Sequence, residues 1–154
     1  MKRLQNSKTV LALLTILIMP APLSAQDFDE VEILTHHVKD NIYYLEGSGG
    51  NIGVIIGDDG VLIVDNQFAP LTNKIEAAIT DLTKLPVTFV VNSHFHYDHT
   101  DGNENFGKAG AFIVAQDNAR RRMESAQVLA SGYSQRRYEK VGLPKITFFD
   151  AMRF

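Results

Sequence analysis

The sequence predicts an α/β sandwich built on a mixed β-sheet. The first strand-like runs follow one another with short turns between them, which favours antiparallel pairing. Further along the chain, strand-like runs alternate with helical patterns, which favours parallel strands joined by helices. A dense group of histidines then follows an apolar run, at the carboxyl end of a predicted strand. Functional sites in such sheets usually lie at that end of the strands.

The first part of the domain is predicted to hold antiparallel strands. Two of its apolar runs are joined by the segment Gly57-Asp58-Asp59-Gly60, which is a strong hairpin signal. Residues 61–64 are all apolar and show no alternation, so we expect that strand to be buried on both faces. The predicted strands in this part are residues 31–38, 41–46, 51–56 and 61–65.

The middle of the chain is predicted to alternate helices with strands. Pro70 marks a helix start, and residues 87–91 form a β-branched run that leads directly into the histidines. Residues 111–115 are another short strand, and Asp117 is predicted to cap a helix from residue 118 towards 130. The helix after Pro70 has an apolar stripe at helical spacing, which indicates core packing: Leu71, Ile75, Ala78, Ile79 and Leu82.

The first 25 residues have the three parts of a secretory signal. Basic residues open the chain, residues 10–19 are almost entirely apolar, and small residues precede the expected cleavage point after Ala25. The apolar run is too short to span a bilayer comfortably. We therefore expect residues 26–154 to form one domain of an exported protein, periplasmic or secreted, with no stable membrane association once the signal is cleaved.

The charge balance argues against nucleic acid as a partner. Without residues 1–25 the chain keeps 12 basic and 18 acidic side chains, a net charge of −6. Nucleic-acid binding needs a basic surface, which an acidic chain does not favour. The sequence has no cysteine, so disulfides and thiolate metal ligands are excluded. Residues 132–141 are read as a charged loop, and a further strand is predicted to begin at Pro144.

The segment His94-Phe95-His96-Tyr97-Asp98-His99 is the strongest functional signal in the sequence. Imidazole and carboxylate together suit zinc, iron or manganese. In an extended segment His94, His96 and Asp98 share one face, and His99 points elsewhere unless the chain turns after it. Such a segment can supply ligands to two neighbouring ions. The alternatives are histidines packed in the core, or a flexible histidine tract, and a group this dense is poorly explained by either.

Residues 92–102 resemble the signature of the metallo-β-lactamase superfamily, H-x-H-x-D-H with a glycine three residues on. The resemblance covers about residues 31–154. It implies a four-layer αβ/βα sandwich with a two-metal site between the sheets, of which this chain would hold only the amino-terminal half. A half-sandwich exposes the sheet face that its other half would cover, which favours aggregation.

The resemblance also implies a role for each motif residue. His94 and His96 would bind the first metal, and Asp98 and His99 the second, with Asp98 as the catalytic residue that orients the nucleophile. Asp65 is similar to a family aspartate that supports the site, and an ordinary strand-end aspartate is the equal alternative. The family's remaining ligands would include further histidines, and none follows His99. Two histidines and a glycine lie outside the ligand set and are read as structural: His36, His37 and Gly102.

The function implied by the resemblance is that of an exported metal-dependent hydrolase. A hydroxide bound by two metal ions would attack an ester, thioester, lactone or β-lactam substrate. Zinc is the expected metal, with two ions in a complete protein, and iron or manganese is the alternative. Two other functions remain open: a mono-iron oxidoreductase of the same fold, and a truncated, non-catalytic metal-binding fragment. Fold and motif do not decide the substrate.

Overall fold

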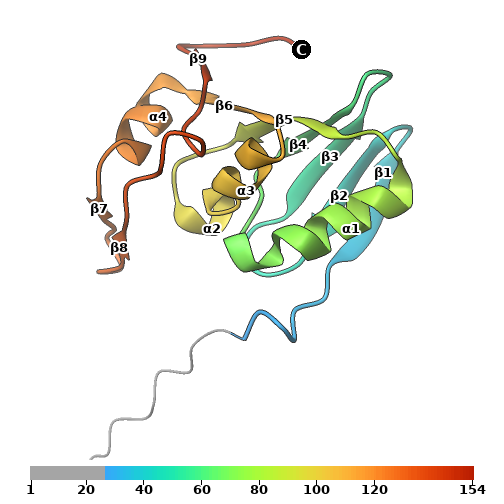
Figure 1. The fold of residues 1–154 in the computed structure, drawn as a ribbon, viewed down its shortest axis with the longest axis horizontal. Coiled ribbons are helices and arrows are strands. Elements are labelled where there is room, and N and C mark those ends of the chain that lie inside the picture. The colour runs from blue at the N-terminus through green and yellow to red at the C-terminus, as the bar shows by residue number, and fades with distance from the viewer. Residues whose placement is uncertain (1–26) are drawn as a thin grey trace, which may run out of the picture.

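A computed structural model describes residues 27–154, so the predicted signal peptide lies outside the described residues. Within them, the main sheet has seven strands in the order β1-β2-β3-β4-β5-β6-β9 (Figure 1). The pairs from β1 to β4 are antiparallel, and those from β4 to β9 are parallel. The mixed α/β sheet predicted from the sequence is therefore confirmed.

The antiparallel strands lie close to their predicted positions. Short turns connect them in chain order, as the Gly57–Gly60 segment between the third and fourth strands required. The first strand is an edge of the sheet and its ladder is irregular between His37 and Lys39. These strands are β1 (Leu34–Lys39), β2 (Ile42–Glu46), β3 (Ile52–Ile56) and β4 (Val61–Val64).

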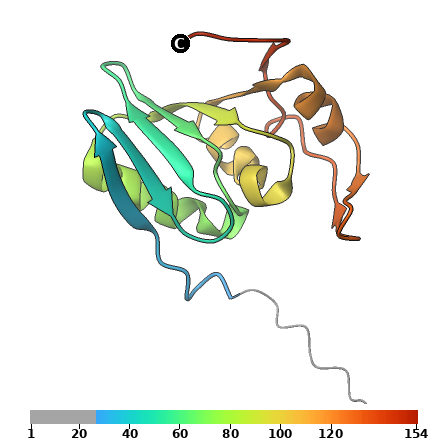
Figure 2. The same ribbon diagram turned by 180° about the vertical axis from the view of Figure 1, so that it is seen from behind.

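The parallel strands are separated by helices, because a parallel pair needs a crossover connection. A short 3₁₀ turn at Ala69–Leu71 leads into the longest helix, which crosses one face of the sheet (Figure 1). Seen from behind, the strands lie in front of that helix (Figure 2). These elements are α1 (Thr72–Leu82), β5 (Val87–Asn92), α2 (Tyr97–Thr100), α3 (Asn103–Lys108), β6 (Phe112–Gln116), α4 (Asp117–Met123) and β9 (Ile146–Phe148).

The core lies between α1 and the sheet face that it covers. Val54, Ile63 and Val90 are fully buried and occupy neighbouring positions on adjacent strands. Ile75 and Ile79 of α1 belong to the same buried cluster. The predicted apolar stripe of this helix therefore packs on the sheet as expected from its spacing.

The expectation that residues 61–64 are buried on both faces is wrong in part. Val61 and Ile63 are fully buried, whereas Leu62 and Val64 are only half-buried. Helices pack on one face of the sheet, while the other receives residues from the end of the chain. There the ring centroid of Phe154 lies 5.4 Å from that of Phe89.

The helix predicted from residue 118 towards 130 is shorter than expected. α4 ends at Met123. Its N-cap residue is Gln116 and not the predicted Asp117, and the Gln116 side chain accepts from Asn118 N–H. The side chain of Gln127 donates to the carbonyl oxygens of Arg122 and Ser125. These oxygens would accept backbone N–H groups if the helix continued, and here they are already bonded. A small hairpin follows, of β7 (Gln127–Val128) and β8 (Ser134–Gln135), and β8 lies in the predicted loop.

Among residues 27–154, no helix has the length and hydropathy needed to cross a membrane.

Candidate metal centre

The motif lies at the carboxyl ends of two neighbouring parallel strands. β4 ends at Val64 and is followed by Asp65, while β5 ends at Asn92 and is followed by the histidine segment. Asp65 N–H donates to the carbonyl oxygen of Val91 at 2.8 Å, which fixes the end of β4 against β5. Asp65 has a φ of +65°, a left-handed conformation that is uncommon outside glycine. Such a turn at a strand end is frequent at functional sites.

The buried carboxylate of Asp65 accepts hydrogen bonds from two residues of the motif segment. Oδ1 accepts from Ser93 N–H at 2.7 Å, and Oδ2 accepts from the Ser93 hydroxyl at 2.6 Å. Oδ2 also lies 2.9 Å from Nδ1 of His99. A carboxylate is an acceptor, so the proton of a neutral His99 is assigned to Nδ1. Nε2 of His99 is then left with a free lone pair, the form that binds a metal ion.

Ser93 transmits the same constraint to His94. The serine oxygen lies 3.0 Å from Nδ1 of His94, and its own proton is directed to Asp65. The serine oxygen therefore accepts from Nδ1–H of His94, and Nε2 of this imidazole is also left free. One aspartate thus sets the tautomer of two imidazoles, directly for His99 and through a hydroxyl for His94.

The predicted ligands lie side by side. The ring centroid of His94 is 4.2 Å from that of His99 and 4.7 Å from that of His96. Nε2 of His99 lies 3.6 Å from Oδ2 of Asp98. One ligand atom from each of Asp65, His94 and His99 falls within 4.8 Å of the others. The tightest group of ligand atoms therefore includes Asp65, whose expected role was one of support.

The extended segment that the motif was expected to form is absent, because the chain bends at residues 93–95 directly after β5. The backbone of His96 is extended, with φ −65° and ψ 143°, but α2 begins at the next residue. Asp98 and His99 therefore lie on a single helical turn. The turn that was expected after His99 comes before it, because α2 bends the segment back towards Asp65. His99 C=O then accepts from Asn66 N–H at 2.9 Å.

The electrostatics of the site favour a neutral His94. Burial lowers the pKa of His94, and positive charge on His99 or His96 would lower it further. Asp65 and Asp98 act in the opposite direction without reversing the shift. Neutral imidazole is the form that binds metal, so the donor set of this structure fits a zinc-type ion.

Glycines and amides fit closely around the site, and among these residues sequence reasoning had assigned a role only to Gly102. A Cβ on Gly50 would collide with the His99 imidazole, 3.0 Å from Nδ1. The Gln67 side chain holds the loop of Gly50 in place, because its Nε2 donates to Gly50 C=O at 2.6 Å. A Cβ on Gly102 would lie 2.9 Å from Oδ1 of Asn66, which agrees with a structural role for this glycine.

A buried amide network, also missed, ties the strand ends to α3. Asn103 Oδ1 accepts from Asn66 at 2.6 Å and from Asn92 at 3.0 Å. Asn103 Nδ2 donates back to Asn92 at 2.8 Å and to Gly142 C=O at 3.1 Å. The residues that follow β4, end β5 and begin α3 are thus joined through one asparagine. The only available signal was an asparagine near the motif, which alone identifies no partner.

The two histidines outside the motif lie on the edge strand β1. Nε2 of His36 is 3.0 Å from Oε2 of Glu46, and Nε2 of His37 is 3.0 Å from Asp40 C=O. His37 is exposed and His36 half-buried. These contacts agree with their interpretation as surface or packing residues.

Known proteins share this fold and sequence pattern. Residues 45–147 match the family model described as the metallo-beta-lactamase superfamily. The metallo-β-lactamase MIM-1 from Novosphingobium pentaromativorans is 26% identical, with a TM-score of 0.64 over 75% of this chain and 44% of that chain. FEZ-1 from Legionella gormanii is 17% identical, with a TM-score of 0.65 over 80% and 49%. The class B3 di-zinc enzyme LRA-12 from an Alaskan soil metagenome is 20% identical, with a TM-score of 0.57 over 68% and 40%. The chain therefore spans less than half the length of each of these three structures, and the last two show the fold alone.

Proposed function

The chain belongs to the metallo-β-lactamase superfamily, and we propose that it carries the metal-binding residues of an exported zinc-dependent hydrolase. The observation that carries this proposal is the convergence of His94 and His99, each with Nδ1 in a hydrogen bond and Nε2 left free. Histidines whose other nitrogen is held in this way are typical metal ligands.

The proposed roles follow the motif. His94 and His96, whose rings are in contact, bind one ion, and Asp98 and His99 bind a second. Asp65 does not bind metal itself but positions His99 and Ser93, because its two oxygens already accept three hydrogen bonds. Nitrogen and carboxylate oxygen ligands without thiolate suit Zn²⁺, with iron and manganese as alternatives.

The chemistry follows from these positions. Zinc held by these residues would supply two things: a lower pKa for a bound water and polarisation of a carbonyl oxygen of the substrate. Asp98 would orient the reacting water, and Asp65 with Ser93 holds the imidazoles of His94 and His99 in the tautomer protonated at Nδ1 and correctly turned. The substrate is a small molecule with an ester, thioester, lactone or β-lactam bond, and the export signal directs the protein to the periplasm or outside the cell.

Metal content is the experiment that tests this proposal. Residues 26–154 are purified and titrated with Zn²⁺ and with Fe²⁺, beside the variants His96→Ala and His37→Ala. We expect tight Zn²⁺ binding by the wild type and by His37→Ala, because His37 lies on β1 outside the motif, and a large loss in His96→Ala. Equal Zn²⁺ affinity in all three proteins would contradict the proposal. Binding of iron in preference to zinc would point to the oxidoreductase chemistry of this fold.

Hydrolysis is measured after metal loading. A panel of a cephalosporin, an aryl ester, a thioester and a lactone covers the proposed bond types. Turnover that disappears in Asp98→Ala assigns the activity to this site. Turnover that persists in Asp98→Ala would contradict the catalytic role of Asp98.

Signal cleavage is tested separately. The full chain, with residues 1–25, is expressed, and the mass of the mature protein shows whether it begins at Gln26, as cleavage after Ala25 requires.

A further inference from the structure

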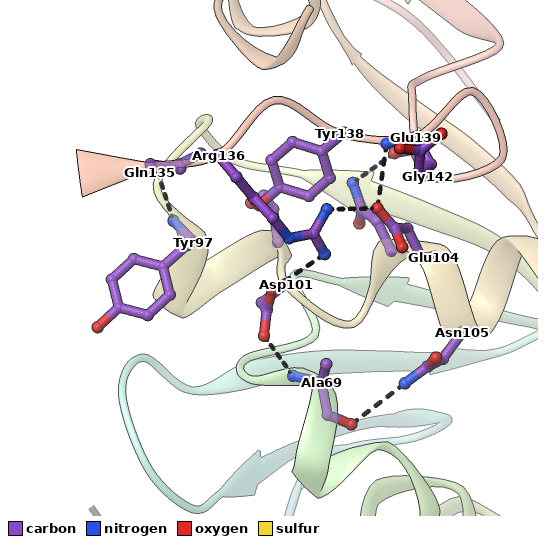
Figure 3. A network of polar contacts seen from close by, with 12 residues as sticks. Ala69, Tyr97, Asp101, Glu104, Asn105, Gln135, Arg136, Tyr138, Glu139 and Gly142 are labelled. Carbon is purple, nitrogen blue, oxygen red and sulfur yellow. Dashed lines mark hydrogen bonds and ion pairs between the residues drawn. The ribbon is translucent and has the colours of Figure 1, made fainter. Parts of the chain in front are cut away.

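One buried side chain of the β7–β8 hairpin contacts the main chain on both sides of His96. Gln135 is 3% exposed. Its Oε1 accepts from Tyr97 N–H at 3.1 Å, and its Nε2 donates to Phe95 C=O at 2.7 Å. Figure 3 shows the Gln135 amide directed at the backbone nitrogen of Tyr97. The two bonded groups belong to the peptide units before and after the His96 α-carbon, so together they restrict φ and ψ of His96.

His96 needs this contact because it is the N-cap residue of α2 but does not cap it. The first N–H groups of a helix have no partner within the helix, and the N-cap side chain usually accepts from one of them. The His96 side chain makes no such bond, and its ring lies against that of His94. Gln135 supplies the acceptor for Tyr97 N–H from another part of the chain. The imidazole of His96 makes no hydrogen bond to the helix and remains available to the proposed metal site.

Two neighbouring contacts hold the segment after the hairpin against α2 and α3. The Tyr138 hydroxyl lies 2.6 Å from Oγ1 of Thr100, which donates to His96 C=O at 2.8 Å. Burial raises the pKa of Tyr138, so its hydroxyl keeps its proton and can donate to Thr100. Beside it, Arg136 donates to Oε1 of Glu104 at 2.8 Å (Figure 3). The segment that directly follows Gln135 is therefore anchored to α2 and α3 while Gln135 contacts the backbone around His96.

We propose that Gln135 is a positioning residue of the metal site, whose amide fixes the backbone of His96 and so directs its imidazole towards the ion. This inference rests on the proposed metal-binding role of His96. Without the amide, the backbone around His96 has more freedom, and metal binding carries the cost of ordering it. Loss of a group that orients a ligand commonly lowers metal affinity by about ten- to a hundredfold, and we expect about tenfold here.

The test compares Gln135→Met with Gln127→Met. Methionine keeps the length and volume of glutamine but removes both hydrogen bonds. Gln127 is the matched control, because it pairs with Gln135 across the hairpin and its amide donates to Arg122 and Ser125. Co²⁺ is the probe, since its d–d absorption reports ligand geometry as well as affinity. Amide hydrogen exchange at Tyr97 reports the proposed contact without any metal.

The expected result is faster exchange at Tyr97, about tenfold weaker Co²⁺ binding and an altered d–d spectrum in Gln135→Met, with Gln127→Met unchanged. A packing role for Gln135 would lower the unfolding temperature without changing the spectrum. If Gln135→Met does not fold, Gln135→Glu replaces it, because glutamate keeps the acceptor for Tyr97 but loses the donor to Phe95. Wild-type Co²⁺ affinity and spectrum in the folded variant would overturn this inference alone, whereas a wild-type chain that binds no Co²⁺ would overturn the metal site as well.

Discussion

Asp65 Oδ2 lies 2.9 Å from Nδ1 of His99, and this hydrogen bond joins the residue after β4 to helix α2. Asp65 is 5% exposed, so little water competes for its carboxylate. The bond both orients the His99 ring and assigns its proton to Nδ1. The buried carboxylate therefore leaves Nε2 of His99 with the free lone pair that the proposed metal site requires.

Replacing Asp65 with asparagine should weaken zinc binding by about ten- to a hundredfold while the chain stays folded. The amide keeps the size of the carboxylate, but it has one acceptor oxygen and cannot accept from Ser93 and His99 as before. Isothermal titration with Zn²⁺ measures the affinity, and nitrogen chemical shifts of the imidazoles show whether His99 changes tautomer. Asp59→Asn, in the exposed β3–β4 turn, is the control. An unchanged His99 tautomer in Asp65→Asn would contradict this role.

Replacing Ser93 with alanine should release His94 and leave His99 largely unaffected. The backbone N–H of Ser93 still donates to Asp65, so the loss is confined to the hydroxyl between Asp65 and Nδ1 of His94. We expect His94 to populate both neutral tautomers and zinc affinity to fall by up to about tenfold. Ser93→Thr keeps a hydroxyl and should restore both properties. Imidazole chemical shifts measure the effect, and a single Nδ1–H tautomer of His94 in Ser93→Ala would refute it.

The features that the sequence predicted correctly depend on residues close together in the chain. The apolar spacing of α1 and the Gly57–Gly60 turn act over a few residues, so their patterns survive in the folded protein. Asp65 was associated with the motif only through the family resemblance, and the structure brings the two together because β4 and β5 are parallel and end at one edge of the sheet. The histidine segment is likewise local, which is why its ligand types could be read directly.

The features that could not be predicted depend on contacts between distant residues. Gln135 is separated by 38 and 40 residues from the two groups that it bonds, and its neighbours in the sequence indicated only a loop. The end of α4 at Met123 is favoured by the side-chain bonds of Gln127. The burial of Leu62 was overestimated, because an apolar run does not reveal what covers each of its faces.

Replacing Gly50 with alanine should lower zinc affinity by displacing His99. The new Cβ would lie 3.0 Å from Nδ1 of His99 and closer still to Cε1, so the ring must shift, which disturbs its hydrogen bond to Asp65. Gly50 does not have a positive φ, so alanine adds no backbone strain. We expect a loss of about tenfold in Zn²⁺ affinity, comparable to removing a group that orients a ligand. Gly57→Ala is the control, because its Cβ meets only Gly60 C=O at 3.3 Å, and equal affinity in both variants would argue against the prediction.

Glu104 should make the stability of the chain depend on pH. Burial raises the pKa of Glu104, but the hydrogen bonds from Arg136 and from Glu139 N–H, with the charge of Arg136, outweigh burial and lower it overall. A carboxyl whose pKa is lowered in the folded state stabilises the protein above its unfolded pKa of about 4.3, and that contribution is lost as the pH falls through the folded value. Glu104→Gln should therefore reduce the free energy of unfolding at pH 7 by about 1 kcal/mol, a modest value because Arg136 is largely exposed. Urea unfolding at neutral and acidic pH measures this, with the exposed Glu32→Gln as control. A difference between wild type and Glu104→Gln that stays constant down to acidic pH would show that the charge of Glu104 is not its cause.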